Sequence, residues 1–382
     1  MYKVTDEFPH EIILNQKKGP FISIYQPGER DSSTSKQDLI RFKNAMREVE
    51  NSLKKEYDDD LVAKRMKPLI DLYEDRIFWN NVQDGVAVLS DEEDTIVYKL
   101  KRPVKELAVV SDSFHIKPLI RNFQSADRYH LLGISRDEFQ LYEGNRYGFE
   151  KVDLGEDTPN TLEEILGKEL TEPHLTSAAY GGVGGTPMFH GHGGKKDEVE
   201  IDTERFFKYV DKFILDEYST VERIPLVLVA LNEHQGEFRK ISHNKYLLDE
   251  GINLNFDALD KEQLKKTFWE NLEPHYIRKT KELVDRFETS RAQDLGSSDL
   301  VQVARASVEN RIGTLLIEAD REIGGKLNKE TGEITEGRIT KPSFDDILDD
   351  IGEMVLKNKG EVIVLPKGRM PSDTGVAAIY RF

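Results

Sequence analysis

Residues 129–154 read YHLLGISRDEFQLYEGNRYGFEKVDL. Three short runs in this stretch, at 129–135, 138–144 and 148–154, place apolar and polar residues in near alternation. A period of two is typical of β-strands that bury one face, and the short polar links between the runs suit tight turns. The stretch therefore predicts a three-stranded meander.

A long helix and a buried strand are expected after the meander. The segment DTERFFKYVDKFILDEY has apolar residues at helical spacing, and its first residues, Asp202 and Thr203, are both suited to cap a helix start. The run IPLVLVAL at 224–231 is continuously apolar, as in a strand buried on both faces. Two further helices are predicted, over 233–248 and 259–287. This order favours a mixed α/β sheet in the middle of the chain.

The segment before the meander has the pattern of a separate α/β domain. Helical periodicity covers 35–53 and 61–78. Strands are predicted at 21–27, 85–90, 95–100 and 106–112, with a short helix at 114–123.

The segment after residue 290 predicts a third unit with an α/β/α arrangement. A helix over 300–312 precedes a buried strand at 313–320, and 321–341 is interpreted as a loop. A helix is expected over 343–360, with Ser343 as its N-cap and Gly360 just past its end. The remaining strands are expected at 361–366 and 375–382. The predicted fold class is α/β, with three α/β domains in tandem at 1–125, 126–289 and 290–382.

Composition limits the classes of function. The 382 residues are 38% hydrophobic and 33% charged, as in ordinary soluble globular proteins. The chain has no cysteine, shows no signal-peptide pattern and lacks an apolar run of membrane-spanning length, so a cytoplasmic location without a membrane partner is expected. The formal net charge of −17 lies mainly in residues 126–289. This balance disfavours non-specific coating of nucleic acid but leaves room for local basic patches.

A glycine-rich stretch, SAAYGGVGGTPMFHGHGGKKDEVEID, spans 177–202. No Gly-Lys-Ser/Thr follows its glycines, which disfavours a Walker-type phosphate loop. His190 and His192 could ligate a metal, but metal sites normally use three or four ligands, and no metal is assigned. A mobile surface loop is the simplest interpretation, because glycine gives the backbone its greatest freedom. Long loops inside compact domains are often functional, so contact with a partner is the alternative that we favour.

Other candidate residues favour structural roles. The basic run KLKRPVK at 99–105 suits an edge strand better than a phosphate site. Trp79 and Trp269 are interpreted as core residues. His234 and Gln235 open a helix after a buried strand, where ligands often bind, but capping is favoured.

The paired carboxylates Asp345–Asp346 and Asp349–Asp350 are interpreted as the solvated face of a helix. No Ser-His-Asp arrangement, HExxH or G-x-S-x-G motif is present. The sequence leaves catalysis open but favours a non-catalytic protein, and no catalytic residue or cofactor is assigned.

The order of these parts resembles the class-1 peptide-chain release factors of archaea and eukaryotes, and Pelota. The meander, the glycine-rich loop, the helix DTERFFKYVDKFILDEY and the strand IPLVLVAL are similar to the middle domain of that superfamily. The segments VARASVENRIGTLLIEAD, FDDILDDIGEMVLKNKGEVIVLP and GVAAIYRF resemble its C-terminal domain, which has the fold of kink-turn-binding ribosomal proteins. The segments PFISIYQPGERDSSTSKQDLIRFKNAMREVE, RIFWNNVQDGVAVLSD and SFHIKPLIRNF look like the bacterial branch, the bacterial archaeo-eukaryotic release factor-like family.

Two signatures of termination are absent from the sequence. In release factors the loop carries Gly-Gly-Gln, which enters the peptidyl-transferase centre of the ribosome. Here the glycine pairs are followed by Val183, Thr186 and Lys195. The stop-codon-reading Asn-Ile-Lys-Ser tetrapeptide does not occur in residues 1–125. The chain is similar in this respect to Pelota and to the Balon-type hibernation factors, which occupy the ribosomal A site without reading a stop codon or releasing peptide.

The resemblance implies a translation factor that enters the A site of idle or stalled ribosomes, in hibernation or rescue, without peptide-release activity. The ribosome, through its rRNA, would be the partner, and a translational GTPase is a candidate second partner. Two alternatives stay open: a hydrolase acting on RNA or peptidyl-tRNA, and an acidic protein-binding adaptor. The residues expected to contact RNA lie within or beside the loop 181–194: Gly181, Gly182, Gly184, Gly185, His190, His192, Gly193, Gly194, Lys195 and Lys196.

Overall fold

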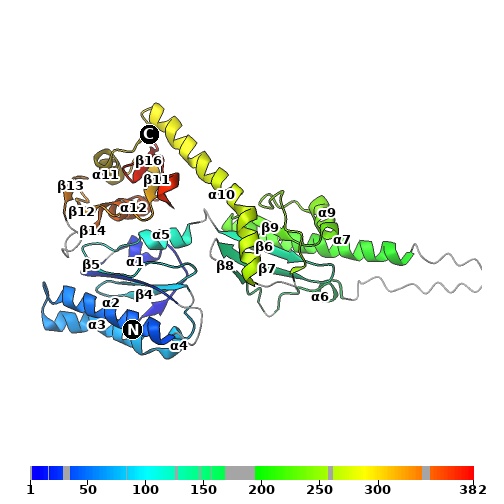
Figure 1. Ribbon diagram of the computed structural model, residues 1–382, viewed down its shortest axis with the longest axis horizontal. Coiled ribbons are helices and arrows are strands. Elements are labelled where there is room, and N and C mark those ends of the chain that lie inside the picture. Colours follow the sequence, from blue (N-terminus) through cyan, green and yellow to red (C-terminus); the bar gives the residue numbers. More distant parts are fainter. Residues whose placement is uncertain are drawn as a thin grey trace, which may run out of the picture. The chain divides into compact units, whose positions relative to one another are not determined.

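The computed structural model divides the chain into two compact units (Figure 1). It describes residues 2–15, 17–28, 35–82, 84–124, 128–145, 148–155, 157–167, 194–256, 261–337 and 345–382. One unit joins Met1–Ala126 to Arg278–Phe382, and the other is Asp127–Ile277. The predicted α/β fold class is confirmed, because both units pack helices on β-sheets. The division into three domains at 1–125, 126–289 and 290–382 stays a prediction.

The N-terminal half of the first unit is built on a five-stranded sheet with the order β1-β4-β3-β2-β5. Its strands are β1 (Lys3–Val4), β2 (Phe21–Pro27), β3 (Gly85–Ser90), β4 (Thr95–Leu100) and β5 (Leu107–Ser111). One face packs against α2 (Ser35–Leu53), α3 (Asp59–Glu74) and α4 (Arg76–Trp79), and the other against α1 (Glu11–Leu14) and α5 (Lys117–Phe123) (Figure 1). Both faces are covered, so β2 and β3 are buried at nearly every position.

The C-terminal half of the first unit contains two more sheets. The four-stranded sheet β10-β16-β11-β15 consists of β10 (Gly296–Ser297), β11 (Ile312–Glu318), β15 (Glu361–Leu365) and β16 (Val376–Tyr380). The three-stranded sheet β13-β12-β14 consists of β12 (Gly324–Leu327), β13 (Ile334–Glu336) and β14 (Asp345–Asp346). Its helices are α11 (Leu300–Val308), α12 (Ile347–Lys357), the last part of α10 (Lys261–Ala292) and a 3-10 turn at Lys367–Arg369.

One apolar core runs through both halves of this unit. Phe21 and Tyr25 of β2 belong to the same buried cluster as Ile347 and Ile351 of α12 and Val364 of β15. The first and last parts of the chain therefore share a core. Helix α12 contributes to it with side chains that are nearly all buried.

The second unit is built on a four-stranded mixed sheet with the order β8-β7-β6-β9. Its strands are β6 (Tyr129–Ile134), β7 (Phe139–Asn145), β8 (Gly148–Lys151) and β9 (Leu226–Val229). Strands β6 to β8 are antiparallel and β9 pairs in parallel with β6, so the predicted meander and mixed sheet are confirmed. The helices are α6 (Leu162–Leu166), α7 (Gly194–Ile214), α8 (Thr220–Glu222), α9 (Asn232–Ile241) and the first part of α10, with a π-helical turn at Leu215–Ser219.

Helix α7 starts earlier than the sequence predicted. Its first residue is Gly194, so Asp202 and Thr203 lie inside the helix and do not cap it. The Thr203 hydroxyl instead donates a hydrogen bond to the carbonyl of Val199, one turn earlier in the same helix (2.8 Å). A Ser, Thr or Asp at an expected start can satisfy its side chain within a helix, which makes such positions weak markers of a boundary.

Three other predicted boundaries are wrong. The expected loop over 321–341 contains β12 and β13, which pair as antiparallel strands. The helix expected over 343–360 begins at Ile347, and its cap is Asp346, whose carboxylate accepts the amide of Leu348 (3.2 Å). Ser343 lies outside the described residues. The helix expected over 233–248 ends at Ile241, because the carboxylate of Asp211 binds the hydroxyl and amide groups just beyond it.

Within the described part of the chain, no helix combines the length and the apolar character needed to cross a membrane.

Candidate functional site

The glycine-rich segment predicted to contact a partner lies mostly outside the described residues. This applies to Gly181, Gly182, Gly184, Gly185, His190, His192 and Gly193. The described chain resumes at Gly194, the first residue of α7, and the backbone of Lys195 and Lys196 is helical. The predicted contact residues therefore stay a prediction, with their C-terminal end fixed at the start of a long helix.

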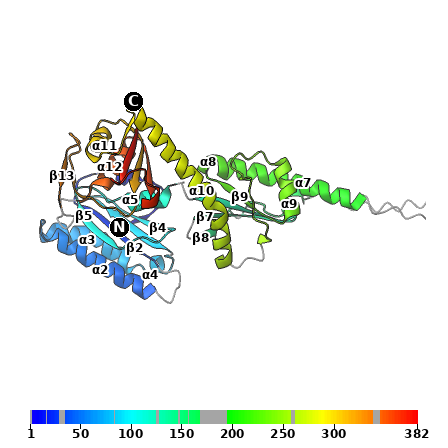
Figure 2. The same cartoon turned by 45° about the horizontal axis from the view of Figure 1, so that its top comes forward.

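Helix α7 is held to the second unit by its C-terminal half. Phe206, Val210 and Ile214 are fully buried in the cluster that includes Leu132 and Leu228 of the sheet. The first turns of α7 extend past the end of this sheet in both views (Figures 1 and 2). The packed half thus acts as an anchor, and the glycine-rich segment joins the helix at its far end.

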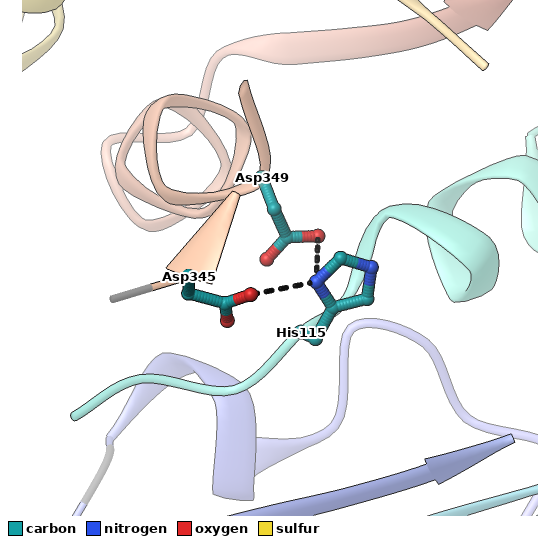
Figure 3. Close-up of side chains that lie close together, drawn as sticks. All are labelled: His115, Asp345 and Asp349. Atoms are coloured by element: carbon teal, nitrogen blue, oxygen red, sulfur yellow. Dashed lines mark hydrogen bonds and ion pairs between the residues drawn. The ribbon is translucent and has the colours of Figure 1, made fainter. Parts of the chain in front are cut away.

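A second candidate site lies within the first unit, around the side chain of His115 (Figure 3). The Nδ1 atom of His115 is 3.2 Å from Oδ1 of Asp345 and 3.9 Å from Oδ1 of Asp349. Figure 3 shows His115 on the segment that leads into α5, with the carboxylates of Asp345, from β14, and Asp349, from the first turn of α12, turned toward its ring. The exposed fraction is 4% for His115, 3% for Asp345 and 0% for Asp349, so all three groups are removed from bulk solvent.

The backbone around His115 is fixed by buried hydrogen bonds. The hydroxyl of Tyr25 donates to the His115 carbonyl (2.5 Å), and the His115 amide donates to the hydroxyl of Ser23 (3.0 Å). Both partners lie on β2, an inner strand of the N-terminal sheet between β3 and β5. The imidazole is therefore attached to a rigid element.

Asp349 joins α12 to the start of α5. Its carboxylate accepts the amide of Ile116 (2.8 Å) and the amide of Lys117, which are free donors at the beginning of a helix. Bonds of this kind stabilise the ionised carboxylate. Asp349 thus orients one segment of the N-terminal half against one helix of the C-terminal half.

Two other buried acids of this region have lysine partners. Asp346 forms an ion pair with Lys117. Glu353 lies 3.2 Å from the Nζ atom of Lys329 and 3.5 Å from that of Lys357. These carboxylates are compensated by nearby positive charge, as buried charges normally are.

The remaining three acids are not compensated in this way. In the part of the chain that the structure describes, no lysine or arginine forms an ion pair with Asp345, Asp349 or Asp350. Asp350 accepts a hydrogen bond from the hydroxyl of Ser113 (2.7 Å), and the other two face His115. The second carboxylate oxygen of Asp345, Oδ2, is buried without a hydrogen-bond partner. Two of these three carboxylates therefore share one imidazole, and the third is held only by a hydroxyl group.

The electrostatics of the cluster reflect this surplus of acid. Burial alone would lower the pKa of His115, but the carboxylates of Asp349 and Asp345 outweigh it and raise this pKa to about 9. Burial raises the pKa of Asp349 to about 8 against the opposing effect of His115, and it raises the pKa of Asp350 to about 7. Protons bind this cluster more tightly than they bind exposed groups, because uncompensated negative charge is costly away from water.

A cavity of about 350 Å³ borders the cluster, and its lining includes His115 and Lys117. Its other charged lining residues are of both signs: Arg102, Lys105, Glu106, Arg121, Asp320 and Glu322. Lys105 forms an ion pair with Asp320 (3.1 Å). The charged side chains that line the cavity with His115 therefore show no clear preference for anions.

This cluster was not predicted from the sequence. Asp345–Asp346 and Asp349–Asp350 were expected on a solvated helix face, and that prediction is wrong, because exposed fractions are between 0% and 5% for all four residues. The covering segment, residues 113–117, lies far away in the sequence, so no local pattern reveals it. One signal was present: FDDILDDIGEMVL contains four aspartates and no lysine or arginine to neutralise them.

The other sequence candidates have structural positions. Trp79 is 2% exposed and donates its indole N–H to the carbonyl of Leu72 (2.8 Å), so its predicted core role is confirmed. Gln235 donates to the carbonyl of Ala230, just after β9 (3.0 Å), but the N-cap of α9 is Leu231, whose side chain makes no capping hydrogen bond, so the predicted capping role is wrong. His234 lines a separate cavity of about 690 Å³ in the second unit.

Comparison with known proteins finds one family model that matches the middle of the chain. Residues 128–311 match the family model of bacterial archaeo-eukaryotic release factor family 3. No curated protein matches the chain. The solved structure of the archaeal translation termination factor aRF1 is 14% identical and has a TM-score of 0.28, with 97% of this chain and 95% of that chain covered.

Two further solved structures show a similar level of likeness. Dom34 of S. cerevisiae, described as a translation termination-like factor involved in RNA quality control pathways and interacting with Hbs1, is 13% identical with a TM-score of 0.40. The alignment covers 78% of this chain and 79% of Dom34. Ribosome-bound archaeal Pelota, solved with ABCE1, is 14% identical with a TM-score of 0.39 and coverages of 78% and 77%. The family match supports the resemblance drawn from the residues: residues 128–311 are similar to bacterial archaeo-eukaryotic release factor family 3.

Proposed function

We propose that this protein is a ribosome-associated translation factor that occupies the A site of idle or stalled ribosomes, in hibernation or rescue. The match of residues 128–311 to a release factor family carries the proposal. The matched region contains the glycine-rich segment and the whole of α7, which in this superfamily are the parts directed to the peptidyl-transferase centre. The function then lies in a segment displayed by a well-packed helix.

The same sequence argues against peptide release. Hydrolysis of the peptidyl ester in this superfamily depends on Gly-Gly-Gln, and glutamine follows none of the glycine pairs here. The side chain that would position the attacking water is therefore missing. We propose a role in occupying the ribosome without catalysis.

Contact with rRNA would come from the loop 181–194 and the lysines that follow it. Glycines permit close approach of the backbone to RNA, while His190, His192, Lys195 and Lys196 supply groups that stack on bases or pair with phosphates. The net charge of −17 makes general attraction to RNA weak, so binding should depend on this segment rather than on the whole surface. A translational GTPase is the proposed second partner, by way of the C-terminal part of the chain.

Co-sedimentation with vacant 70S ribosomes over a salt series tests the proposal. The wild-type protein is compared with a variant lacking residues 181–194, and with a control in which the same residues are replaced by a Gly/Ser linker of equal length. Binding that weakens steeply with salt, and that both changes reduce at least tenfold, is expected. Loss in the deletion but not in the linker variant would show that only the length of the segment matters.

A second assay addresses the absence of catalysis. Ribosomes carrying peptidyl-tRNA in the P site are mixed with the protein, and free peptide is measured against a true release factor. No release above the ribosome-only rate is expected. Release that disappears when His190 and His192 are both replaced by alanine would overturn the non-catalytic role and support a hydrolase. If the protein does not co-sediment with ribosomes at any salt concentration, the proposed function is wrong.

A further inference from the structure

We propose that His115, Asp345 and Asp349 bind one divalent metal ion of the Mn²⁺ or Zn²⁺ class, which links the N-terminal and C-terminal halves of the first unit. This inference is independent of the proposed function, since it rests on a cluster outside the second unit and outside the glycine-rich segment.

The distances between the three donor atoms suit a shared cation. Two ligands bound to one such ion at about 2.1 Å lie roughly 3.0–3.4 Å apart. The distance from His115 Nδ1 to Asp345 Oδ1 is 3.2 Å, and a ligand atom from each of the three residues lies within 4.8 Å of the others. The 3.9 Å distance from Nδ1 to Asp349 Oδ1 requires a contraction of only about half an ångström to reach that range.

One carboxylate oxygen of the cluster has no hydrogen-bond partner in the structure. Oδ2 of Asp345 is buried and has no hydrogen-bond partner, although the residue is only 3% exposed. An unsatisfied buried carboxylate oxygen is costly, and buried polar atoms in proteins almost always have a partner. Figure 3 shows the Asp345 carboxylate beside the His115 ring, with Oδ1 on the dashed line to Nδ1; a cation held by both oxygens of this carboxylate would also give Oδ2 a partner.

The charge of the cluster also calls for a cation. Asp345, Asp349 and Asp350 have no lysine or arginine ion-pair partner in the described residues, whereas the neighbouring Asp346 and Glu353 do. A divalent ion would offset two of the three negative charges and leave the imidazole neutral, which is the form that binds metal.

The supporting bonds around the ligands are already in place. Asp349 accepts amides at the start of α5, and Asp345 Oδ1 accepts the amide of Asp346 (2.8 Å). The His115 backbone is held by Tyr25 and Ser23. Ligand carboxylates in metal sites are commonly oriented by hydrogen bonds of this kind. His115 also lines the neighbouring cavity.

The choice of metal follows from the donors. One imidazole nitrogen disfavours Ca²⁺ and Mg²⁺, which prefer oxygen alone, and two carboxylates with no thiolate disfavour copper(I). An ion of this class would connect residue 115 to residues 345 and 349. Its role would be structural, as a clamp within the shared core.

Metal-dependent thermal unfolding of the full chain tests the site. After treatment with EDTA and dialysis, Mn²⁺, Zn²⁺ or Mg²⁺ is added, and stoichiometry is measured by titration calorimetry. One Mn²⁺ or Zn²⁺ per chain is expected, with a rise in midpoint of about 5 °C at a hundredfold excess over the dissociation constant. Mg²⁺ should give at least tenfold weaker binding.

Two matched variants locate the ion. Asp345→Asn removes a ligand at constant size and should abolish the shift, while the metal-free protein keeps or gains stability because a buried uncompensated charge is removed. Asp350→Asn neutralises a buried carboxylate of α12 that is not a ligand, and it should retain the shift. A shift that persists unchanged in Asp345→Asn would overturn the proposal.

Two further measurements keep the test decisive. The double variant His190→Ala, His192→Ala should bind metal as the wild type does. Loss of binding in that variant would place the metal in the glycine-rich segment and overturn the proposal.

If circular dichroism shows that Asp345→Asn does not fold, electron paramagnetic resonance of Mn²⁺ added to the wild-type protein tests the site instead. One tightly bound ion that His115→Gln releases supports the site, and the absence of any bound ion refutes it.

Discussion

A single guanidinium group connects distant backbone segments in the N-terminal half of the first unit. Arg65 of α3 is 4% exposed, and its Nη2 atom donates to the carbonyls of Pro20 and Ser90 (3.0 Å for Ser90). Arg65→Ala would leave both carbonyls without this donor, so we expect a loss of about 1–3 kcal/mol in the free energy of unfolding. Urea denaturation measures this loss. Lys64→Ala, on the exposed side of the same helix, should change stability by less than about 0.5 kcal/mol.

The carboxylate of Asp75 should make the stability of the protein depend on pH. The Tyr2 hydroxyl and then the Phe78 amide donate to its carboxylate and lower its pKa. A lowered folded-state pKa stabilises the protein above the unfolded-state value and loses this effect as pH falls through the folded-state value. Asp75→Ala should cost about 0.5–2 kcal/mol at pH 7, because the N-cap of α4 is also lost.

The comparison with Asp75→Asn separates charge from capping, because asparagine caps equally well. The stability difference between wild type and Asp75→Asn should shrink as the pH is lowered from about 5 to 2, around the unfolded-state value. Urea denaturation at several pH values checks this. A difference that stays constant over that range would mean that the carboxylate contributes only as a cap.

At the level of elements, the strand β6 depends on a glycine. A Cβ atom at Gly133 would lie 2.8 Å from the Phe256 ring, which packs directly on the strand. Gly133→Ala should therefore cost about 1–3 kcal/mol through overpacking. Gly236→Ala is the control, because it lies inside α9 with open space around it and should stabilise the protein by about 0.5–1 kcal/mol. Equal effects of both substitutions in thermal unfolding would contradict the role of Phe256.

Helices and strands could be predicted from the sequence where their apolar residues recur at a regular local spacing. The meander of the second unit and α2 (Ser35–Leu53) follow from alternation and helical spacing alone. Helix α12 shows the limit: its pattern gives an apolar face and an acidic face, and acidic faces normally lie in water. The acidic face is buried because residues 113–117 cover it, and this contact joins parts of the chain that are over two hundred positions apart. The candidate metal cluster could not be inferred for the same reason.

At the level of the whole molecule, the two halves of the first unit should respond to perturbation together. Ile351 of α12 is fully buried in the cluster that contains residues of both β2 and β15. Ile351→Ala should cost about 2–5 kcal/mol. Hydrogen exchange measured by mass spectrometry should accelerate in peptides covering 21–27 as well as 361–365. As a control, Phe206→Ala, in the core of the second unit, should accelerate exchange in the second unit instead. If Ile351→Ala accelerates exchange only in peptides covering 361–365, the two halves of the first unit unfold separately.

The shared core has a consequence for the order in which this protein forms during its own synthesis. The side chains of β16 (Val376–Tyr380) complete an apolar cluster that begins with Ile12 and Phe21. The N-terminal sheet thus leaves the ribosome long before the partner of its apolar face exists, whereas the second unit has all its strands earlier. In nascent chains the second unit should therefore become resistant to protease first. The N-terminal sheet should depend on chaperones until β16, the last strand, has left the ribosome.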